Sequence, residues 1–151
     1  LLELGYTDIT VLDISTKSIE RAKARLGEKA TAITWMSSDI IDFEPQRKYD
    51  FWHDRAAFHF LTTEIQIIKY LAIVKQGVKS GGHLVLGTFS DKGPTRCSGL
   101  EIRQYTEASM SALFEKDFKR IKCVEETHVT PFSTQQNFVF CSFQRTSMPI
   151  L

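Results

Sequence analysis

The segment TDITVLDIS, residues 7–15, decides the fold class, because it is typical of a buried strand that leads directly into a helix. Its apolar residues are mainly β-branched, which favours a strand over residues 7–14. Ser15 is a residue type that caps helices, and Gly27 is one that ends them. Between these two residues apolar side chains recur at helical spacing, at Ile19, Ala22 and Leu26.

Strands and helices alternate along the rest of the chain. Further strands are expected at 31–36, 49–53, 83–89, 119–129 and 137–144. Helices are expected to start at Thr62 or Thr63 and at Thr106, with a turn at 80–82. The first of these helices should bury the stripe Ile65, Ile68, Leu71 and Ala72. This order predicts an α/β fold with a mostly parallel, doubly wound sheet that has helices on both faces, and its last two strands form an antiparallel hairpin.

The composition is that of one soluble globular domain over residues 1–151. The chain is 42% hydrophobic and 25% charged, and its net charge is +1. Lys and Arg occur without long runs, which argues against a nucleic-acid partner. No apolar run approaches the roughly 20 residues that cross a membrane, and no signal peptide is visible. We therefore expect neither nucleic acid nor a membrane as a partner, and the oligomeric state stays open.

The cysteines and histidines give no metal-binding pattern. Cys97, Cys123 and Cys141 lie far apart with no CxxC pair, and none of the four histidines pairs with a Glu at helical spacing. We expect no metal site. The odd cysteine count predicts reduced thiols, and hence a cytoplasmic protein.

Polar clusters follow three of the expected strands. In an open α/β sheet, ligands bind outside the carboxyl ends of the strands. Asp13 ends the first strand, where a carboxylate can bind ribose hydroxyls or can simply begin the next helix. Asp39 follows the second strand and could accept from an exocyclic amine or lie in a solvated turn, with Asp42 as a competing choice. The segment 52–55, WHDR, is either a polar site or a core Trp beside a surface ion pair.

Together these features resemble the class I S-adenosylmethionine (SAM)-dependent methyltransferases over nearly the whole chain. The resemblance rests on VLDIS, SSDI, YDFWHDRAAFHFL, SGGHLVLGTF and the two terminal strands. WHDRAAFHFL, GPTRCSGL and THVTPFSTQQNF are similar to a subgroup of small methyltransferases in that family. The resemblance to the family implies a Rossmann-like sheet of strand order 3-2-1-4-5-7-6, with SAM as cofactor and S-adenosylhomocysteine (SAH) as product.

The same resemblance implies a set of site residues. Asp13 matches the position that binds the ribose of the cofactor, and Asp39 and Ile40 match positions beside the adenine. Asp54 and Arg55 match the end of strand 4, near the methionine part. The cofactor-binding set is therefore Asp13, Ile14, Ser38, Asp39, Ile40, Asp54 and Arg55.

The resemblance also implies that the family's strand 1 and its glycine-rich loop precede Leu1. The first visible strand matches strand 2 of the family. The expectation is therefore that roughly 40 residues, one βα unit, are missing from the N-terminus. A fragment without that unit is expected to bind no cofactor and to be inactive.

Methyl transfer from a sulfonium is a direct displacement, so the enzyme mainly aligns the reactants and excludes water. A base is needed only where the nucleophile carries a proton. His53 is the first candidate for that base and His59 the second; His128 comes third, and Tyr105 could line the pocket.

The expected substrate is a small molecule or a protein side chain. Two rival functions stay open. A nicotinamide-dependent oxidoreductase would use Asp13 for the same ribose contact. A non-catalytic scaffold could keep the fold without the glycine-rich loop.

Overall fold

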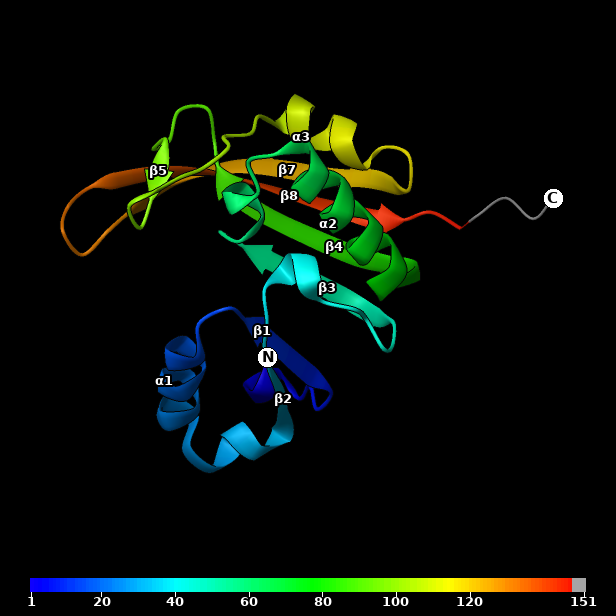
Figure 1. Cartoon of the computed structure of the whole chain (residues 1–151), viewed down its shortest axis with the longest axis vertical. Helices are drawn as coiled ribbons and strands as arrows, with labels where there is room; N and C mark the ends of the chain where they lie inside the picture. The colour runs from blue at the N-terminus through cyan, green and yellow to red at the C-terminus, as the bar shows by residue number, and fades with distance from the viewer. Residues whose placement is uncertain (148–151) are drawn as a thin grey trace. The chain divides into compact units, whose positions relative to one another are not determined.

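The computed structural model describes residues 1–147, which fall into two compact units, Leu1–Glu44 and a second that begins at Pro45 (Figure 1). The single domain expected from the sequence stays a prediction. Within the described residues, no helix is both long enough and apolar enough to cross a membrane.

The first unit is a strand–helix–strand motif. β1 runs parallel to β2, in a register that pairs Ile9 with Ile33 and Asp13 with Ser37. The Ser15 hydroxyl accepts from Ser18 N–H at 3.2 Å and so caps the helix, as the sequence predicts. Its elements are η1 (Leu2–Leu4), β1 (Ile9–Asp13), α1 (Thr16–Leu26), η2 (Gly27–Ala32), β2 (Ile33–Ser37) and η3 (Ile40–Asp42).

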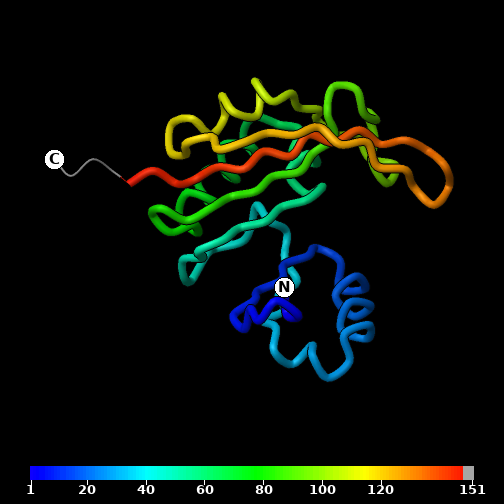
Figure 2. The backbone as a smooth tube through the Cα atoms, turned by 180° about the vertical axis from the view of Figure 1, so that it is seen from behind, coloured from blue at the N-terminus to red at the C-terminus, as the bar shows by residue number. Residues whose placement is uncertain are grey.

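The second unit contains a four-stranded sheet of order β3–β4–β8–β7. β3 is parallel to β4, whereas β4–β8 and β8–β7 are antiparallel (Figure 2). The expected terminal hairpin is confirmed, but this sheet is mixed rather than mostly parallel, because two of its three pairings are antiparallel. The strands are β3 (Tyr49–Arg55), β4 (Val78–Phe89), β7 (Phe118–Val129) and β8 (Gln135–Arg145).

Two helices cover this sheet. Figures 1 and 2 show α2 and α3 on the same face of this unit's sheet. The remaining elements are η4 (Phe58–Phe60), α2 (Glu64–Gly77), α3 (Glu107–Phe114) and the small hairpin of β5 (Arg96–Cys97) and β6 (Leu100–Glu101).

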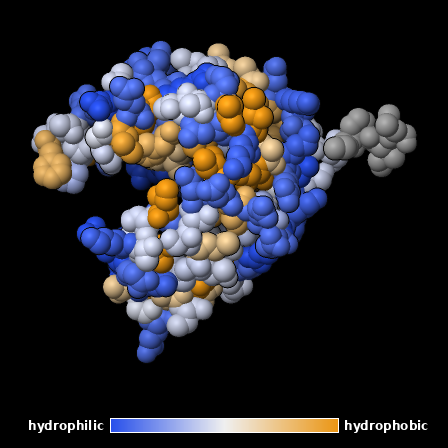
Figure 3. Space-filling view, viewed as in Figure 1, coloured by the Kyte–Doolittle hydropathy of each residue, from blue (hydrophilic) through white to orange (hydrophobic). Residues whose placement is uncertain are grey.

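Helix α2 buries a different stripe from the one that its spacing suggested. Ile65 and Ile68 are 81% and 64% exposed, whereas the buried residues are Ile67, Tyr70, Ile73, Val74 and Gly77. The helix is apolar on almost every side, so periodicity alone did not select the buried face. Figure 3 shows the resulting apolar patches among the polar surface on this side of the molecule.

Aromatic rings fill the space between the helices and the sheet. Phe58 lies at the centre, with its ring centroid 4.6 Å from that of Tyr70 and 5.2 Å from that of Tyr105. Phe114 of α3 continues the cluster to Phe143 of β8, at 5.2 Å between centroids. These contacts fix the chain after β3 against both helices.

The turn expected at 80–82 lies inside β4 as an irregularity of the strand. The pairing of β3 with β4 passes from Tyr49↔Val78 to Phe51↔His83, so the residues between Val78 and His83 bulge out of register. Gly81 has φ +77° there, a conformation that favours glycine.

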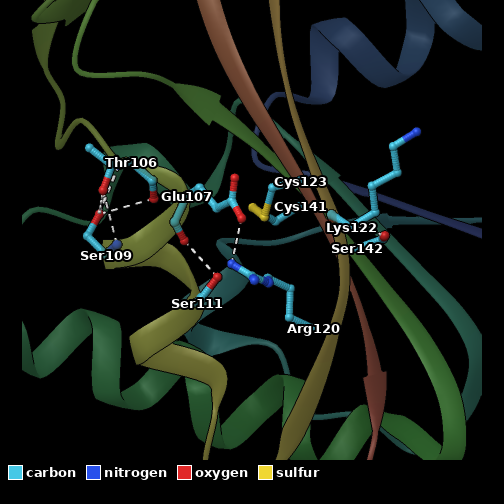
Figure 4. Close-up of a disulfide and its surroundings, with 9 residues drawn as sticks. All are labelled: Thr106, Glu107, Ser109, Ser111, Arg120, Lys122, Cys123, Cys141 and Ser142. Carbon is cyan, nitrogen blue, oxygen red and sulfur yellow. Dashed lines mark hydrogen bonds and ion pairs between the residues drawn. A yellow bond between two sulfur atoms is a disulfide. The ribbon is translucent and has the colours of Figure 1, made fainter.

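A disulfide joins the last two strands, which corrects the expectation of three reduced thiols. Cys123 of β7 and Cys141 of β8 are direct cross-strand partners, and their sulfur atoms are bonded (Figure 4). Cys97 is the free thiol among the described residues. Spacing along the sequence could not reveal this pair, because only the strand register brings the two residues together.

We expect reduction of this disulfide to lower the free energy of unfolding by about 2 kcal/mol, because the bond closes a loop of 18 residues in the unfolded chain. Denaturant unfolding with and without a thiol reductant measures the difference. The Cys123→Ala variant is the control, since reductant should not change its stability. Equal stability of the native protein in both conditions would contradict the prediction.

Candidate functional site

The first unit brings Asp13 and Asp39 to the carboxyl ends of neighbouring strands. Ser38 N–H donates to the carbonyl oxygen of Asp13 at 3.2 Å, so the segment after β2 is tied to the end of β1. Ile14 is exposed, while Ser38 and Ile40 are half-buried beside the two carboxylates. All five residues that the sequence assigned to the cofactor in this unit therefore lie at one edge of its sheet.

Each of these carboxylates uses one oxygen locally. Asp13 Oδ1 accepts from Ser15 N–H at 2.7 Å, and Asp39 Oδ1 accepts from Ile41 N–H at 3.1 Å. Among residues 1–147, no partner is found for the second oxygen of either side chain. Both half-buried carboxylates can therefore still accept a hydrogen bond from a ligand hydroxyl or amine.

Asp54 lies in the second unit, at the end of β3, and its carboxylate is turned into the protein. The residue is 7% exposed. Its Oδ1 accepts from Ala57 N–H and Phe58 N–H, each at 3.2 Å, and its Oδ2 accepts from the Tyr70 hydroxyl at 2.6 Å. Both oxygens are therefore engaged in holding the turn after β3 against helix α2.

The electrostatics of this cluster follow from burial. Desolvation raises the pKa of Asp54, and the hydrogen bonds from Tyr70, Phe58 and Ala57 oppose that shift. Burial is the main cause that raises the pKa of Tyr70, and the neighbouring Asp54 carboxylate raises it further. The Tyr70 hydroxyl also accepts a hydrogen bond from the Trp52 side chain, which opposes this rise. The half-buried Trp52 thus completes a chain of side-chain hydrogen bonds that runs from β3 through α2 to the turn.

Arg55 and His53 flank Asp54 on the strand and are both exposed. The Arg55 guanidinium lies 5.4 Å from the ring centroid of Phe138. The His53 ring stacks near Phe51, with 6.4 Å between centroids. Of the residues assigned to the cofactor and to catalysis in this unit, these two present their side chains to solvent.

His59 is fully buried in η4. Its Nδ1 accepts from the backbone N–H of Phe89, at the end of β4, at 3.2 Å. Burial lowers the pKa of His59 from 6.5 to about 4, so the ring is neutral near pH 7. With Nδ1 occupied as an acceptor, the ring proton is on Nε2, which does not favour His59 as a general base.

Tyr105 lies beside the same strand end. Its backbone N–H donates to the carbonyl oxygen of Phe89 at 3.1 Å. The side chain is 2% exposed, and burial raises the pKa of its hydroxyl to about 12. The hydroxyl is therefore protonated at neutral pH and does not act there as a base. His128, the third base candidate, is an exposed residue of β7.

The segment 91–102 leaves the sheet after β4 and is fastened at both ends. Ser90 N–H donates to the carbonyl oxygen of Asn137 at 3.0 Å, and the Ser90 hydroxyl is hydrogen-bonded to the Asn137 side chain. At the other end Arg103 N–H donates to the carbonyl oxygen of His59 at 2.8 Å. A Cβ atom at Gly93 would lie 2.5 Å from the carbonyl oxygen of Asn137, so this close approach requires glycine.

Sequence reasoning missed Tyr70 and Asn137. Tyr70 is one apolar helix residue among many, and it lies 16 residues from Asp54, with which it pairs. The sequence pattern places Asn137 only at the start of a strand. Neither had a local signal, because their roles depend on contacts between distant segments.

Comparison with known proteins decides the family. The model of the nodulation protein S (NodS) family matches residues 2–148 of the chain. The chain belongs to the NodS family. Its resemblance to the class I SAM-dependent methyltransferases is thereby confirmed.

Solved structures share the fold of this NodS-family chain. N-methyltransferase NodS from Bradyrhizobium japonicum WM9 superposes with a TM-score of 0.74 at 19% identity, covering 91% of this chain and 73% of that one. The 1,6-didemethyltoxoflavin-N1-methyltransferase of Burkholderia thailandensis, solved with 1,6-didemethyltoxoflavin and SAH, gives 0.72 at 17% identity, covering 97% and 64%. At these identities the likeness concerns the fold.

A curated relative matches part of the chain in sequence. The malonyl-[acyl-carrier protein] O-methyltransferase of Anoxybacillus flavithermus is 36% identical over 85 residues, which are 56% of this chain. The match covers 31% of that relative, so the chain spans about a third of its length.

Proposed function

We propose that this NodS-family chain takes part in SAM-dependent methyl transfer to a small molecule or a protein side chain. The observation that carries the proposal is the pair of half-buried carboxylates at the ends of β1 and β2, each with one oxygen open to a ligand. Carboxylates at this edge suit a ribose and an exocyclic amine, the two polar parts of an adenosine.

The residues present fit such a cofactor. Asp13 would accept from the ribose hydroxyls, with Ile14 beside it, and Ser38, Asp39 and Ile40 would contact the adenine. Arg55 is exposed, with its guanidinium near the Phe138 ring, and would face the methionine carboxylate. Asp54 would not touch the cofactor but would hold the turn that follows Arg55. When bound, SAM supplies a methyl group already activated on a sulfonium.

The remaining work of the chain is orientation, exclusion of water and, for a protonated nucleophile, removal of a proton. His53 is the base that we propose, because it is exposed at the carboxyl end of β3. The small-molecule acceptor is favoured over a protein side chain, since the relative from Burkholderia thailandensis was solved with a small molecule bound.

We expect Asp13→Ala to weaken SAM binding in the full-length protein by roughly 1.5–3 kcal/mol, the usual cost of removing a charged hydrogen-bond partner. Isothermal titration calorimetry measures the change. Glu20→Ala is the matched control, because Glu20 is an exposed carboxylate of the same unit whose ion-pair partner among the described residues is Lys23. An unchanged affinity in Asp13→Ala would overturn the assignment.

We further propose that residues 91–100 form a mobile flap over the substrate, since they follow β4 at the carboxyl edge. Deleting residues 95–98, which include strand β5, should lower turnover about tenfold through poorer alignment of the reactants. SAM affinity should stay within about threefold, because Asp13 and Asp39 are untouched. Full turnover by the shortened protein would contradict the proposal and show that the segment only connects the neighbouring elements.

The two rival functions make different predictions. The antiparallel β4–β8 and β8–β7 pairings favour the methyltransferase sheet over a dinucleotide-binding oxidoreductase. Titration of the full-length protein with SAM and with a nicotinamide dinucleotide separates these two. A scaffold would bind neither cofactor.

We propose that the two sheets match parts of the family order, β2–β1 with strands 3-2 and β3–β4–β8–β7 with strands 4-5-7-6. A cytoplasmic location also stays a proposal. The Cys123–Cys141 bond argues against it, because disulfides are rare in reducing compartments. Thiol alkylation in intact cells, read by mass spectrometry, tests the location.

A further inference from the structure

Three buried side-chain polar atoms of the described residues have no hydrogen-bond partner: His59 Nε2, Tyr105 Oη and Thr88 Oγ1. A buried donor without an acceptor is costly, so such atoms in native proteins call for an explanation. His59 and Tyr105 are both hydrogen-bonded to the backbone of Phe89. The His59 ring accepts from the Phe89 N–H, and the backbone N–H of Tyr105 donates to the Phe89 carbonyl oxygen.

The hydrogen bonding of His59 fixes which nitrogen is the donor. The Phe89 N–H donates to Nδ1, so in the neutral ring Nδ1 has no proton and Nε2 has one. The ring is held in this orientation by Phe60 and Phe89, each with its centroid 4.8 Å from that of His59. Nε2 is therefore a fixed N–H donor that lacks an acceptor.

This donor lies where segment 91–102 begins and ends. The segment starts just beyond Phe89, whose N–H binds the His59 ring, and it returns at Arg103, whose N–H binds the His59 carbonyl oxygen. The bond from Arg103 N–H to the His59 carbonyl oxygen therefore ties the far end of the segment to the turn that carries His59. The location is the carboxyl end of β4, the edge at which ligands of open α/β sheets bind.

We propose that His59 Nε2–H donates a hydrogen bond to a carbonyl or carboxylate oxygen of the methyl acceptor and so positions it. The proposal rests on the methyltransferase function and names a chemical feature of its substrate. A neutral N–H donor accepts no hydrogen bond, so it disfavours an ammonium group at this place.

Nuclear magnetic resonance of ¹⁵N-histidine-labelled full-length protein tests the proposal directly. Acetate and acetamide are the probes, and ethylammonium is the negative control. We expect the spectra to show His59 as the Nε2–H tautomer, and acetate or acetamide to shift its Nε2–H resonance in a saturable way. Ethylammonium should leave the resonance unmoved. The titration is run with and without SAH, so a protein that fails to bind SAH, which would contradict the proposed function, still reports on His59.

Two variants separate the two ends of the ring. His59→Asn keeps an oxygen near the place of Nδ1, to accept from Phe89 N–H, and has no donor near Nε2. His59→Gln places an amide N–H near Nε2. We expect His59→Asn to weaken binding of the shifting probe about tenfold and His59→Gln to stay within about threefold of wild type.

The outcomes that overturn the proposal are equally specific. A Nε2–H resonance that no probe moves and that shows contact only with a long-lived water would assign the donor to a structural water. Equal probe affinity in wild type and His59→Asn would also refute it. SAH affinity that stays within about threefold in both variants would confirm that their effects concern the acceptor and leave the cofactor site intact.

Discussion

We expect Asp54→Ala to lower the free energy of unfolding by about 3 kcal/mol, because it leaves two buried donors and one partly buried donor without an acceptor. These donors are the backbone N–H groups of Ala57 and Phe58 and the hydroxyl of Tyr70. Each unsatisfied buried donor costs about 1–3 kcal/mol, and partial relaxation of the turn keeps the total near the lower bound. Denaturant unfolding of the full-length protein measures the loss.

Asp50→Ala is the matched control, since Asp50 lies on the same strand and its side chain is 84% exposed in an ion pair with Lys79. Such surface pairs contribute at most about 1 kcal/mol. Tyr70→Phe removes only one of the donors to Asp54 and should fall between the two variants. A loss in Asp54→Ala no greater than that in Asp50→Ala would show that the cluster does not hold the turn.

Acidification should destabilise the protein through His59 by about 3 kcal/mol between pH 6.5 and pH 4. Burial lowers the pKa of His59 to about 4, while in the unfolded chain it stays near 6.5. Between these values the unfolded state binds a proton that the folded state rejects, so stability falls as the pH falls. The contribution is complete above pH 6.5 and is lost below pH 4.

The effect of His59 is isolated by comparison with His59→Gln, which has no titrating ring. The difference in unfolding free energy between wild type and this variant should change across pH 6.5 to 4 and stay constant above pH 7. Carboxylates titrate in the same range in both proteins, so they cancel in the difference. A pH-independent difference would mean that His59 is not buried in its neutral form.

Most of the local structure could be predicted from the sequence. Ser15 and Thr63 cap their helices as expected, and Gly77 ends α2. These features depend on residues within one turn of each other, so local spacing is enough to find them. The terminal hairpin followed from two strands with no helix between them.

The buried face of α2 could not be predicted in the same way. Its apolar residues allow several stripes, and Tyr70 faces inward because its hydroxyl meets Asp54 across 16 residues of sequence. The disulfide is a similar case, since Cys123 and Cys141 meet only through the register of β7 with β8. Both features depend on distant contacts that spacing does not encode.

The candidate site also contains features that local sequence predicts and features that depend on distant contacts. The sequence by itself determined that Asp13 and Asp39 end their strands, because alternating strands and helices place such residues at the ligand edge of a sheet. Only the tertiary structure decided that Asp54 faces inward and that His59 is a fixed donor. The physical reason is that a carboxylate or an imidazole takes its role from its burial and its hydrogen-bond partners. Those partners, Tyr70 and Phe89, come from other segments of the fold.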